Sequence, residues 1–163
     1  MKVYKESNFQ VEYSVVENSV IVSETNLKGV ITSVNNNFVE ISGYKEEELL
    51  GNNHNIIRHP DVPKIIFKEL WASLEREGKW IGIVKNLRKD KSYYWVKVMI
   101  LPIYDKDNNK KIGYKSVRTS VSFEEKLEAQ RNYDLLKIKT GDAIRKVIYE
   151  KENLKEVFLN LKK

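Results

Sequence analysis

The chain has 163 residues, 41% of them hydrophobic and 32% charged, so it is long enough for one domain with a sizeable core and a short extension. It contains no cysteine, which excludes disulfides, thiolate metal sites, cysteine nucleophiles and cysteinyl adducts of a cofactor. The net charge of +6 is spread among 23 acidic residues and comes with no helix-turn-helix, zinc-finger or RNA-binding signature, so we expect no nucleic-acid partner.

Membrane signals are missing from the sequence pattern as well. No apolar run approaches the ~20 residues that a membrane-spanning helix needs. The first ten residues, MKVYKESNFQ, are polar where a signal peptide is apolar. We therefore expect a cytoplasmic protein with no direct membrane insertion.

The first part of the chain predicts a hairpin followed by short helices. Residues 1–18 show no clear periodicity and are interpreted as an N-terminal segment or cap. The β-branched residues of 19–25 predict a strand, the turn-prone NLKG follows, and residues 30–35 predict its hairpin partner. From Asn35 the spacing becomes helical and Gly43 is a stop signal, after which KEEELLG predicts a further helical turn.

Both histidines of the chain lie in the next segment, HNIIRHPD, from His54 to Asp61. The segment follows a glycine and precedes Pro63, a residue that fits the first turn of a helix. Apolar residues then recur at helical spacing over residues 64–78, which places Trp71 on the inward face of that helix. The octet is therefore predicted to be a connection that enters a helix.

Three strand-like segments complete the compact part, at residues 79–88, 92–104 and 111–121. Alternation along the second segment puts one set of side chains on a common face: Tyr94, Val96, Val98 and Ile100. The order of elements indicates an α+β fold, in which a five-stranded, mostly antiparallel sheet carries helices on one face.

The last part of the chain is predicted to be a helical extension, with a break at Thr140–Asp142. Its second piece has an apolar stripe from Ile144 to Leu161, which a lone helix cannot keep exposed to water. We expect this stripe to dock on another chain rather than on its own domain, and we expect a homodimer. The predicted organisation is an N-terminal segment at 1–18, a compact domain at 19–122 and a helical signalling or dimerisation segment at 123–163.

Several motifs resemble a known family. The run GVITSVNNNFVEISGYKEEELLG is similar to PAS domains in general. The run HNIIRHPDVP, followed by Trp71, KWIGIVKNLRK and YYWV, resembles the FAD-binding PAS domain of bacterial aerotaxis and energy-taxis receptors. The resemblance covers residues 20–119. It implies a PAS fold and a non-covalently held FAD that serves as a redox or oxygen sensor.

The resemblance also implies an output and a partner. The output would be a chemotaxis signal rather than a chemical product. The chain resembles the soluble members of two-protein energy-taxis systems, in which the partner is a membrane-bound methyl-accepting chemoreceptor or its HAMP or signalling region. A cytoplasmic protein that associates with the membrane through such a receptor is therefore expected.

Candidate cofactor-binding residues follow from the same resemblance. The positions that match Arg58, His59 and Asp61 hold FAD in that family. The positions that match Trp71 and Asn86 line or border the flavin site. All five residue types are present in this chain, so each is expected to serve the cofactor.

The chemistry of FAD divides the candidates into two groups. FAD combines a flat ring that must be desolvated with a negatively charged pyrophosphate. Trp71, Trp80 and Ile83 are expected to form walls for the ring. Packing in the core is the alternative for each tryptophan. Arg58 and His59 offer hydrogen-bond donors to phosphate oxygens.

The other polar candidates need separate arguments. Ionised Asp61 only accepts hydrogen bonds, so it is expected to position Arg58 or His59, or to cap the following helix. Asn86 is disfavoured in mid-strand, and its amide both donates and accepts, which suits a flavin edge whose hydrogen bonding changes on reduction. A bulge or a strand-end position is the alternative for Asn86. His54 completes the set of cofactor-binding candidates.

Two other interpretations stay open. A haem-binding PAS gas sensor would use His54 or His59 as an axial ligand, and a cofactor-free PAS dimerisation module would need no ligand. A metal enzyme built on His54, His59 and Asp61 is not expected, because their spacing suits neither a helix face nor strand alternation. Without a phosphate-binding glycine loop, nucleophile elbow or paired carboxylates, the chain is not expected to be an enzyme, and no catalytic or metal-binding residue is assigned.

Overall fold

The computed structural model describes residues 11–141. Its elements follow the predicted order of hairpin, short helices, longer helix, three strands and final helix. The strands are β1 (Ile21–Asn26), β2 (Ile31–Val34), β3 (Trp80–Leu87), β4 (Tyr93–Tyr104) and β5 (Lys111–Thr119). The helices are α1 (Asn36–Ser42), α2 (Glu46–Leu49), the 3-10 helix η2 (His54–Ile57), α3 (Lys64–Glu77) and α4 (Phe123–Thr140).

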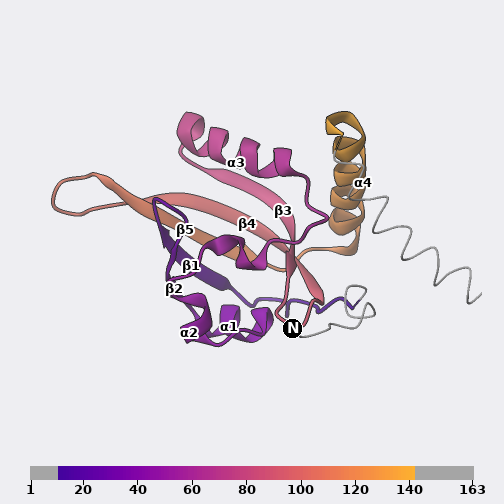
Figure 1. Ribbon diagram of the computed structural model, residues 1–163, viewed down its shortest axis with the longest axis horizontal. Coiled ribbons are helices and arrows are strands. Elements are labelled where there is room, and N and C mark those ends of the chain that lie inside the picture. Colours follow the sequence, from indigo (N-terminus) through magenta and orange to yellow (C-terminus); the bar gives the residue numbers. More distant parts are fainter. Residues whose placement is uncertain (1–10, 142–163) are drawn as a thin grey trace, which may run out of the picture.

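The five strands form one antiparallel sheet in the order β2-β1-β5-β4-β3. Strand β5 is central because it pairs with β1 on one side and with β4 on the other. The face that packs against α1, α2, η2 and α3 is called the inner face here, and α4 stands apart from these helices (Figure 1). The predicted α+β fold, with a five-stranded antiparallel sheet and helices on one face, is confirmed.

Strand alternation decides which residues of β4 face the core. Tyr94, Val96 and Val98 lie on the inner face and are at most 5% exposed, as predicted. Trp95 lies on the outer face and is nevertheless buried, because its ring stacks on Tyr133 of α4 with the centroids 5.7 Å apart. The C-terminal helix α4 therefore packs on the outer face of the sheet, opposite α3.

The ends of the described chain bear on two predictions. Helix α4 ends at Thr140, and Gly141 has left-handed backbone with φ of 78°, which confirms the predicted break. The apolar stripe predicted for residues 144–161 lies outside the described residues. Near the start, Val11 and Tyr13 form backbone hydrogen bonds with Tyr93, so this part of the N-terminal segment runs beside the start of β4. The domain boundaries at 18 and 122 stay predictions.

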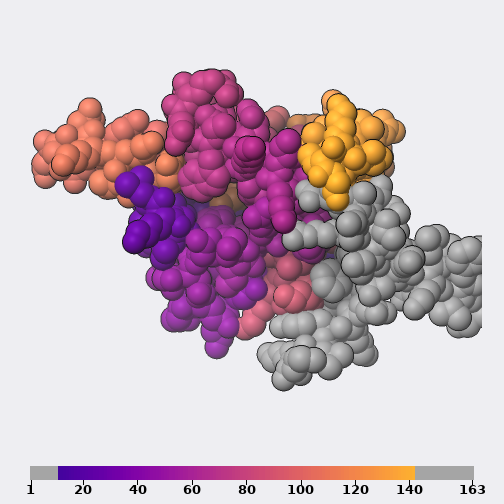
Figure 2. Space-filling view, turned by 45° about the horizontal axis from the view of Figure 1, so that its top comes forward, coloured from indigo at the N-terminus to yellow at the C-terminus, as the bar shows by residue number. Residues whose placement is uncertain are grey.

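Two turns of the sheet differ in character. In the turn between β3 and β4, Lys91 has φ of 72°, a left-handed conformation that favours glycine, so a lysine occupies a position where glycine would be less strained. The hairpin of β4 and β5 is longer, and it extends away from the body of the molecule (Figures 1 and 2). Its polar turn, residues 105–110, lies far from the inner face that the helices cover.

Candidate cofactor site

A cavity of about 310 Å³ lies between the inner face of the sheet and the helices η2 and α3. Its volume falls within the roughly 300–1,000 Å³ of typical small-molecule sites. Much of its wall is apolar, and includes Leu70 and Leu74 of α3. Among the described residues that line it, three are cationic and none is Asp or Glu: the cations are Lys28, Arg58 and Arg118. The cavity therefore favours a ligand with an apolar body and a negative or hydrogen-bond-accepting part.

Trp80, at the start of β3, forms part of the cavity wall and is only 9% exposed. A Cβ atom at Gly82 would come within 2.5 Å of its indole ring. The missing side chain at Gly82 thus lets the indole lie close to the strand. Trp80 both lines the cavity and belongs to the buried core, and its contact with a flavin ring stays a prediction.

Trp71 lies at the rim of the cavity rather than in the core. Its side chain is 46% exposed and meets the ring of Tyr114 edge-on, with the centroids 5.3 Å apart. Leu70 and Leu74 occupy the inward face of α3 instead. The predicted inward position of Trp71 is therefore wrong in part, because Trp71 lies beside the buried stripe rather than within it.

Asn86 is buried on the inner face of β3, where it lines the cavity and lies opposite Tyr94 of β4. Strand β3 pairs with β4 without a register shift, so there is no bulge at Asn86. Asn86 is the penultimate residue of β3, so it lies at the end of the strand, as the second alternative has it, rather than in mid-strand. On its free edge, β3 forms a single antiparallel bridge between Asn86 and Arg58. This bridge attaches the connection after η2 to the sheet edge, next to the cavity.

Arg58 lies where the cavity meets an open groove of about 680 Å³. Its guanidinium carbon is 3.7 Å from the centroid of the Phe67 ring, a cation–π contact that orients the side chain. Lys64 and Lys68, one turn apart on α3, line the same groove, and no described residue that lines it is acidic. The groove therefore presents three cations. Neither lysine was predicted to be a site residue. Their spacing of four residues in the predicted helix would have placed both on one helix face.

His59 is fully buried beside this groove. Its Nδ1 accepts a hydrogen bond from the backbone N–H of Asp61 at 3.0 Å, and its ring meets that of Tyr93 edge-on. Burial, followed by the charge of Lys85, lowers the pKa of His59 to about 3. The imidazole is thus neutral at pH 7 and adds no positive charge to the groove.

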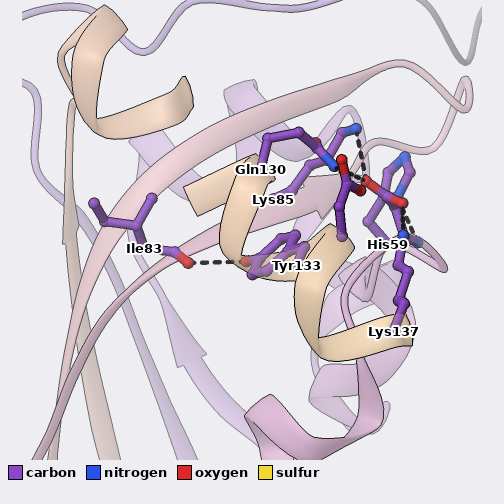
Figure 3. A network of polar contacts seen from close by, with 8 residues as sticks. His59, Ile83, Lys85, Gln130, Tyr133 and Lys137 are labelled. Carbon is purple, nitrogen blue, oxygen red and sulfur yellow. Dashed lines mark hydrogen bonds and ion pairs between the residues drawn. The ribbon is translucent and has the colours of Figure 1, made fainter. Parts of the chain in front are cut away.

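Asp61 does not cap the following helix. The N-cap residue of α3 is Pro63, with no side-chain cap hydrogen bond, so the capping alternative is wrong. The carboxylate of Asp61 instead lies 3.3 Å from Nζ of Lys85, accepts from Nε2 of Gln130 at 3.0 Å, and pairs with Nζ of Lys137 (Figure 3). Gln130 and Lys137 belong to α4. Asp61 therefore connects the cavity side of the sheet to the helix on the outer face.

The charges around Asp61 are mostly buried. Lys85 is 8% and Lys137 is 2% exposed. Burial alone would raise the pKa of Asp61, but Lys85, Lys137 and the Gln130 amide outweigh it and lower this pKa to about 2. One ionised carboxylate thus compensates two buried ammonium groups at neutral pH.

Ile83 was expected to be a wall of the ring site, and this expectation is wrong. Trp80 and Val84 line the cavity, and alternation places Ile83 on the opposite face of β3. There its backbone carbonyl accepts a hydrogen bond from the Tyr133 hydroxyl at 2.8 Å (Figure 3). Ile83 is therefore part of the surface on which α4 packs.

His54 lines the cavity and has two polar neighbours. Its Nε2 lies 2.7 Å from Nη2 of Arg118 and 2.9 Å from Oγ of Ser23. A guanidinium only donates, so this nitrogen accepts and carries no proton. Burial, followed by the charge of Arg118, lowers the pKa of His54 to about 3, which agrees with a neutral ring. Arg118 was not predicted, although alternation in β5 places it on the inner face.

The metal and haem alternatives can be compared with the contacts of the two histidines. Within residues 11–141, no group of three or more His, Cys, Asp or Glu side chains could hold a metal ion. Both imidazoles already use one ring nitrogen as an acceptor, so a haem would have to displace a contact to reach that nitrogen of His54 or His59.

No helix in the described part of the chain is both long and apolar enough to cross a bilayer.

Comparison with known proteins assigns the chain to a family. Residues 31–118 match the family model of the PAS fold, and the chain belongs to the PAS family. It is related to the aerotaxis receptor of Escherichia coli (strain K12), with 41% identity over 109 residues that cover 67% of this chain and 21% of the receptor. It is also 31% identical over 85 residues to the nitrogen fixation regulatory protein of Klebsiella pneumoniae, with 52% and 17% covered. The match thus spans about a fifth or less of these relatives.

Solved structures give the same fold. The PAS domain of a protein from Colwellia psychrerythraea has a TM-score of 0.58 and 27% identity, covering 63% of this chain and 86% of that one. A light-oxygen-voltage domain from a study with a flavin analogue has a TM-score of 0.59 and 22% identity, covering 71% and 85%. At that identity the second likeness shows the fold alone.

Proposed function

We propose that this chain is a PAS redox or oxygen sensor that binds FAD non-covalently and relays the redox state of the flavin to a chemoreceptor. One observation carries the proposal: a cavity with an apolar, tryptophan-bearing wall lies next to a groove lined by three cations, and Arg58 lines both. FAD joins a flat ring to a pyrophosphate, and the two spaces offer one suitable environment to each. The relationship to an aerotaxis receptor supports the same assignment.

The residues present fit the two parts of FAD. Trp80 and Asn86 suit the ring, the first as a wall and the second as an amide at a polar edge. Arg58, Lys64 and Lys68 suit the pyrophosphate because they supply positive charge with no acid among the described groove residues. A bound flavin would supply the capacity to take up and release electrons, whereas the protein binds it, orients it and excludes water.

His59 and Asp61 are proposed to support the cofactor indirectly. The neutral His59 ring accepts from the Asp61 backbone, and this holds the turn that follows Arg58. The Asp61 carboxylate is occupied by Lys85 and by α4, so it is not available to the cofactor. Loss of either side chain is expected to release FAD by displacing Arg58 rather than by removing a direct contact. Trp71, at the rim, is proposed to cover the edge of the bound ring.

The proposed relay passes through Asp61 into α4. Arg58 lines the cavity, and three residues later Asp61 contacts Gln130 and Lys137 of α4. A change of charge or hydrogen bonding at Arg58 or Asn86 therefore acts on the segment that docks α4. A coupling of ~1–3 kcal/mol between cofactor and helix would change the affinity of a partner about 5- to 150-fold.

The proposed partner is a membrane-bound methyl-accepting chemoreceptor, contacted at its HAMP or signalling region, and the proposed assembly is a homodimer in the cytoplasm. Helix α4 offers a surface for either contact, because four of its apolar side chains are 42% to 68% exposed. These side chains are Phe123, Leu127, Leu135 and Ile138.

The test compares the affinities of FAD and riboflavin, which share the ring, whereas riboflavin lacks both the pyrophosphate and the adenosine. Flavin-depleted protein is titrated with each ligand, and the wild type is expected to bind FAD at least tenfold more tightly. The double variant Lys64→Ala/Lys68→Ala removes two exposed charge contacts, each worth up to about 1 kcal/mol. We expect it to weaken FAD binding roughly tenfold and to leave riboflavin binding unchanged.

The matched control is Lys106→Ala/Lys110→Ala, which removes the same charge from the exposed turn of the β4–β5 hairpin. Its FAD affinity should equal that of the wild type. Equal affinity of the wild type for FAD and riboflavin would show that the groove does not bind the pyrophosphate. Binding of haem with neither flavin bound would replace the proposal by the haem alternative.

A further inference from the structure

Arg118 is a buried cation on the central strand of the sheet. It is 2% exposed, and its neighbours on the inner face are Ile21 of β1 and Val98 of β4, both apolar and buried. It also lines the cavity. An arginine in this position is unusual, because long charged side chains are almost never fully buried unless they are paired.

The contacts of Arg118 leave one of its two terminal nitrogens without a partner. Nη2 donates to Oγ of Ser23 at 2.9 Å and to Nε2 of His54 at 2.7 Å. The guanidinium carbon lies 5.1 Å from the centroid of the Phe38 ring. Nη1 is buried and makes no hydrogen bond with any residue of the described part of the chain. None of the three neighbours carries a negative charge.

A purely structural role does not account for this geometry. The Nη2 contacts would connect β1, β5 and η2, but a neutral donor would do so without burying a charge. Desolvating a guanidinium is expensive, and a charge that stays unpaired is strongly destabilising. The described residues that line the cavity include no Asp or Glu to compensate it. The missing negative or accepting partner is therefore expected to be part of the ligand.

We propose that Arg118 is the deep anchor of the bound flavin: it donates from Nη1 to an acceptor atom of the ring and stabilises the negative charge that reduction places there. This rests on the proposed function. Two electrons from a lower-potential electron donor and one proton from solvent convert the neutral oxidised ring into a ring with one negative charge. A buried positive charge beside that ring favours the reduced over the oxidised state. Arg118 thus sets the redox threshold at which the sensor responds.

The test measures how strongly the protein prefers reduced over oxidised flavin. Wild type, Arg118→Lys and Arg118→Gln are loaded with FAD and titrated anaerobically with dithionite against a reference dye. Arg118→Gln removes the charge and is expected to lower the preference for the reduced state at least tenfold, which is a potential about 30 mV more negative for a two-electron couple. Arg118→Lys keeps the charge and should lie between the other two.

The matched control is Lys115→Gln, which removes an exposed charge from the outer face of the same strand. Its potential should equal that of the wild type. If Arg118→Gln has the same potential as the wild type, the role of Arg118 is refuted while flavin binding stands. A wild-type protein that binds no flavin refutes both the proposed function and the anchor.

A second measurement needs no variant that has to fold. In the reduced wild-type protein, the pH at which the ring becomes neutral is followed by absorbance and compared with free reduced flavin. The anchor predicts that bound flavin keeps its negative charge to a pH at least one unit lower, a tenfold effect of the neighbouring cation. Protonation at the same pH as free flavin would contradict it.

Discussion

At the scale of single residues, the two histidines of the chain are both neutral and both act as acceptors. His54 accepts from Arg118, and His59 accepts from the backbone of Asp61. Burial lowers both pKa values to about 3, well below the ordinary value of 6.5. Between pH 3 and pH 6.5 the unfolded chain binds more protons at these histidines than the folded chain does. The stability that the neutral histidines contribute is therefore fully present above pH 6.5 and is lost as the pH falls below it.

This linkage predicts a marked loss of stability in mild acid. Each such histidine lowers the free energy of unfolding by about 1.4 kcal/mol per pH unit below 6.5. The two together are expected to lower it by ~2–4 kcal/mol between pH 7.5 and 5.0. Asp61, with its pKa of about 2, keeps its charge throughout this window. Urea unfolding at the two pH values measures the difference, and an unchanged free energy of unfolding would mean that the histidines are not buried and neutral.

At the scale of elements, the connection between η2 and α3 joins two faces of the sheet. Its first residue, Arg58, bridges to Asn86 beside the cavity, and Asp61 holds Lys85 and Lys137 on the outer side. The side chain of Asp61 is 12% exposed, and it is the acid that pairs with both buried lysines. The contacts between α4 and the connection after η2 therefore depend on this one carboxylate, whereas Tyr133 holds α4 to β3 and β4 independently.

Asp61→Ala is expected to destabilise the protein by about 3–5 kcal/mol, because it leaves two buried ammonium groups unpaired. Lys137→Met should cost less than half of that, since Asp61 keeps Lys85 and Gln130 as partners. Chemical unfolding gives the free energies, and amide hydrogen exchange shows whether α4 is released first.

Glu69→Ala is the control for Asp61→Ala, because its ion pair with Arg76 is about 60% exposed on both sides and should contribute less than about 1 kcal/mol. Equal losses for Asp61→Ala and Glu69→Ala would show that Asp61 does not hold α4. If Asp61→Ala lowers stability but the α4 amides stay fully protected from hydrogen exchange, the Asp61 contacts stabilise the fold without controlling the docking of α4, and the proposed relay is contradicted.

The elements themselves were predictable from local patterns, and their contacts across the sheet were not. Alternation gave the inner face of β4, and glycine stop signals gave the ends of α3 and α4. The burial of Trp95 depends on Tyr133, and the contacts of Asp61 depend on Lys137, 76 residues away. Such pairings require the tertiary fold. Arg118 needs no such pairing to be noticed, because strand alternation alone places this charged residue on the inner face of β5.

At the scale of the whole molecule, the sheet separates the candidate cofactor cavity from the helix that continues towards the C-terminal segment. The residues that line the cavity lie on the inner face. Helix α4 stands apart from the inner-face helices (Figure 1) and packs on Trp95 of the outer face. The proposed relay has to pass around or through the sheet, and the Asp61 contacts lie at the edge strand β3, where it would pass around. The motifs of residues 20–119 were enough to predict this family and its fold, because they lie in the elements that form the cavity.

The absorption spectrum of the purified protein tests the central claim most directly. The account predicts the structured bands of a bound flavin, which bleach when dithionite is added without oxygen and return on exposure to air, and mass spectrometry of the released cofactor should identify FAD. A Soret band would contradict the account in favour of haem. A spectrum without flavin bands, unchanged after incubation with FAD, would contradict it in favour of a module that needs no cofactor.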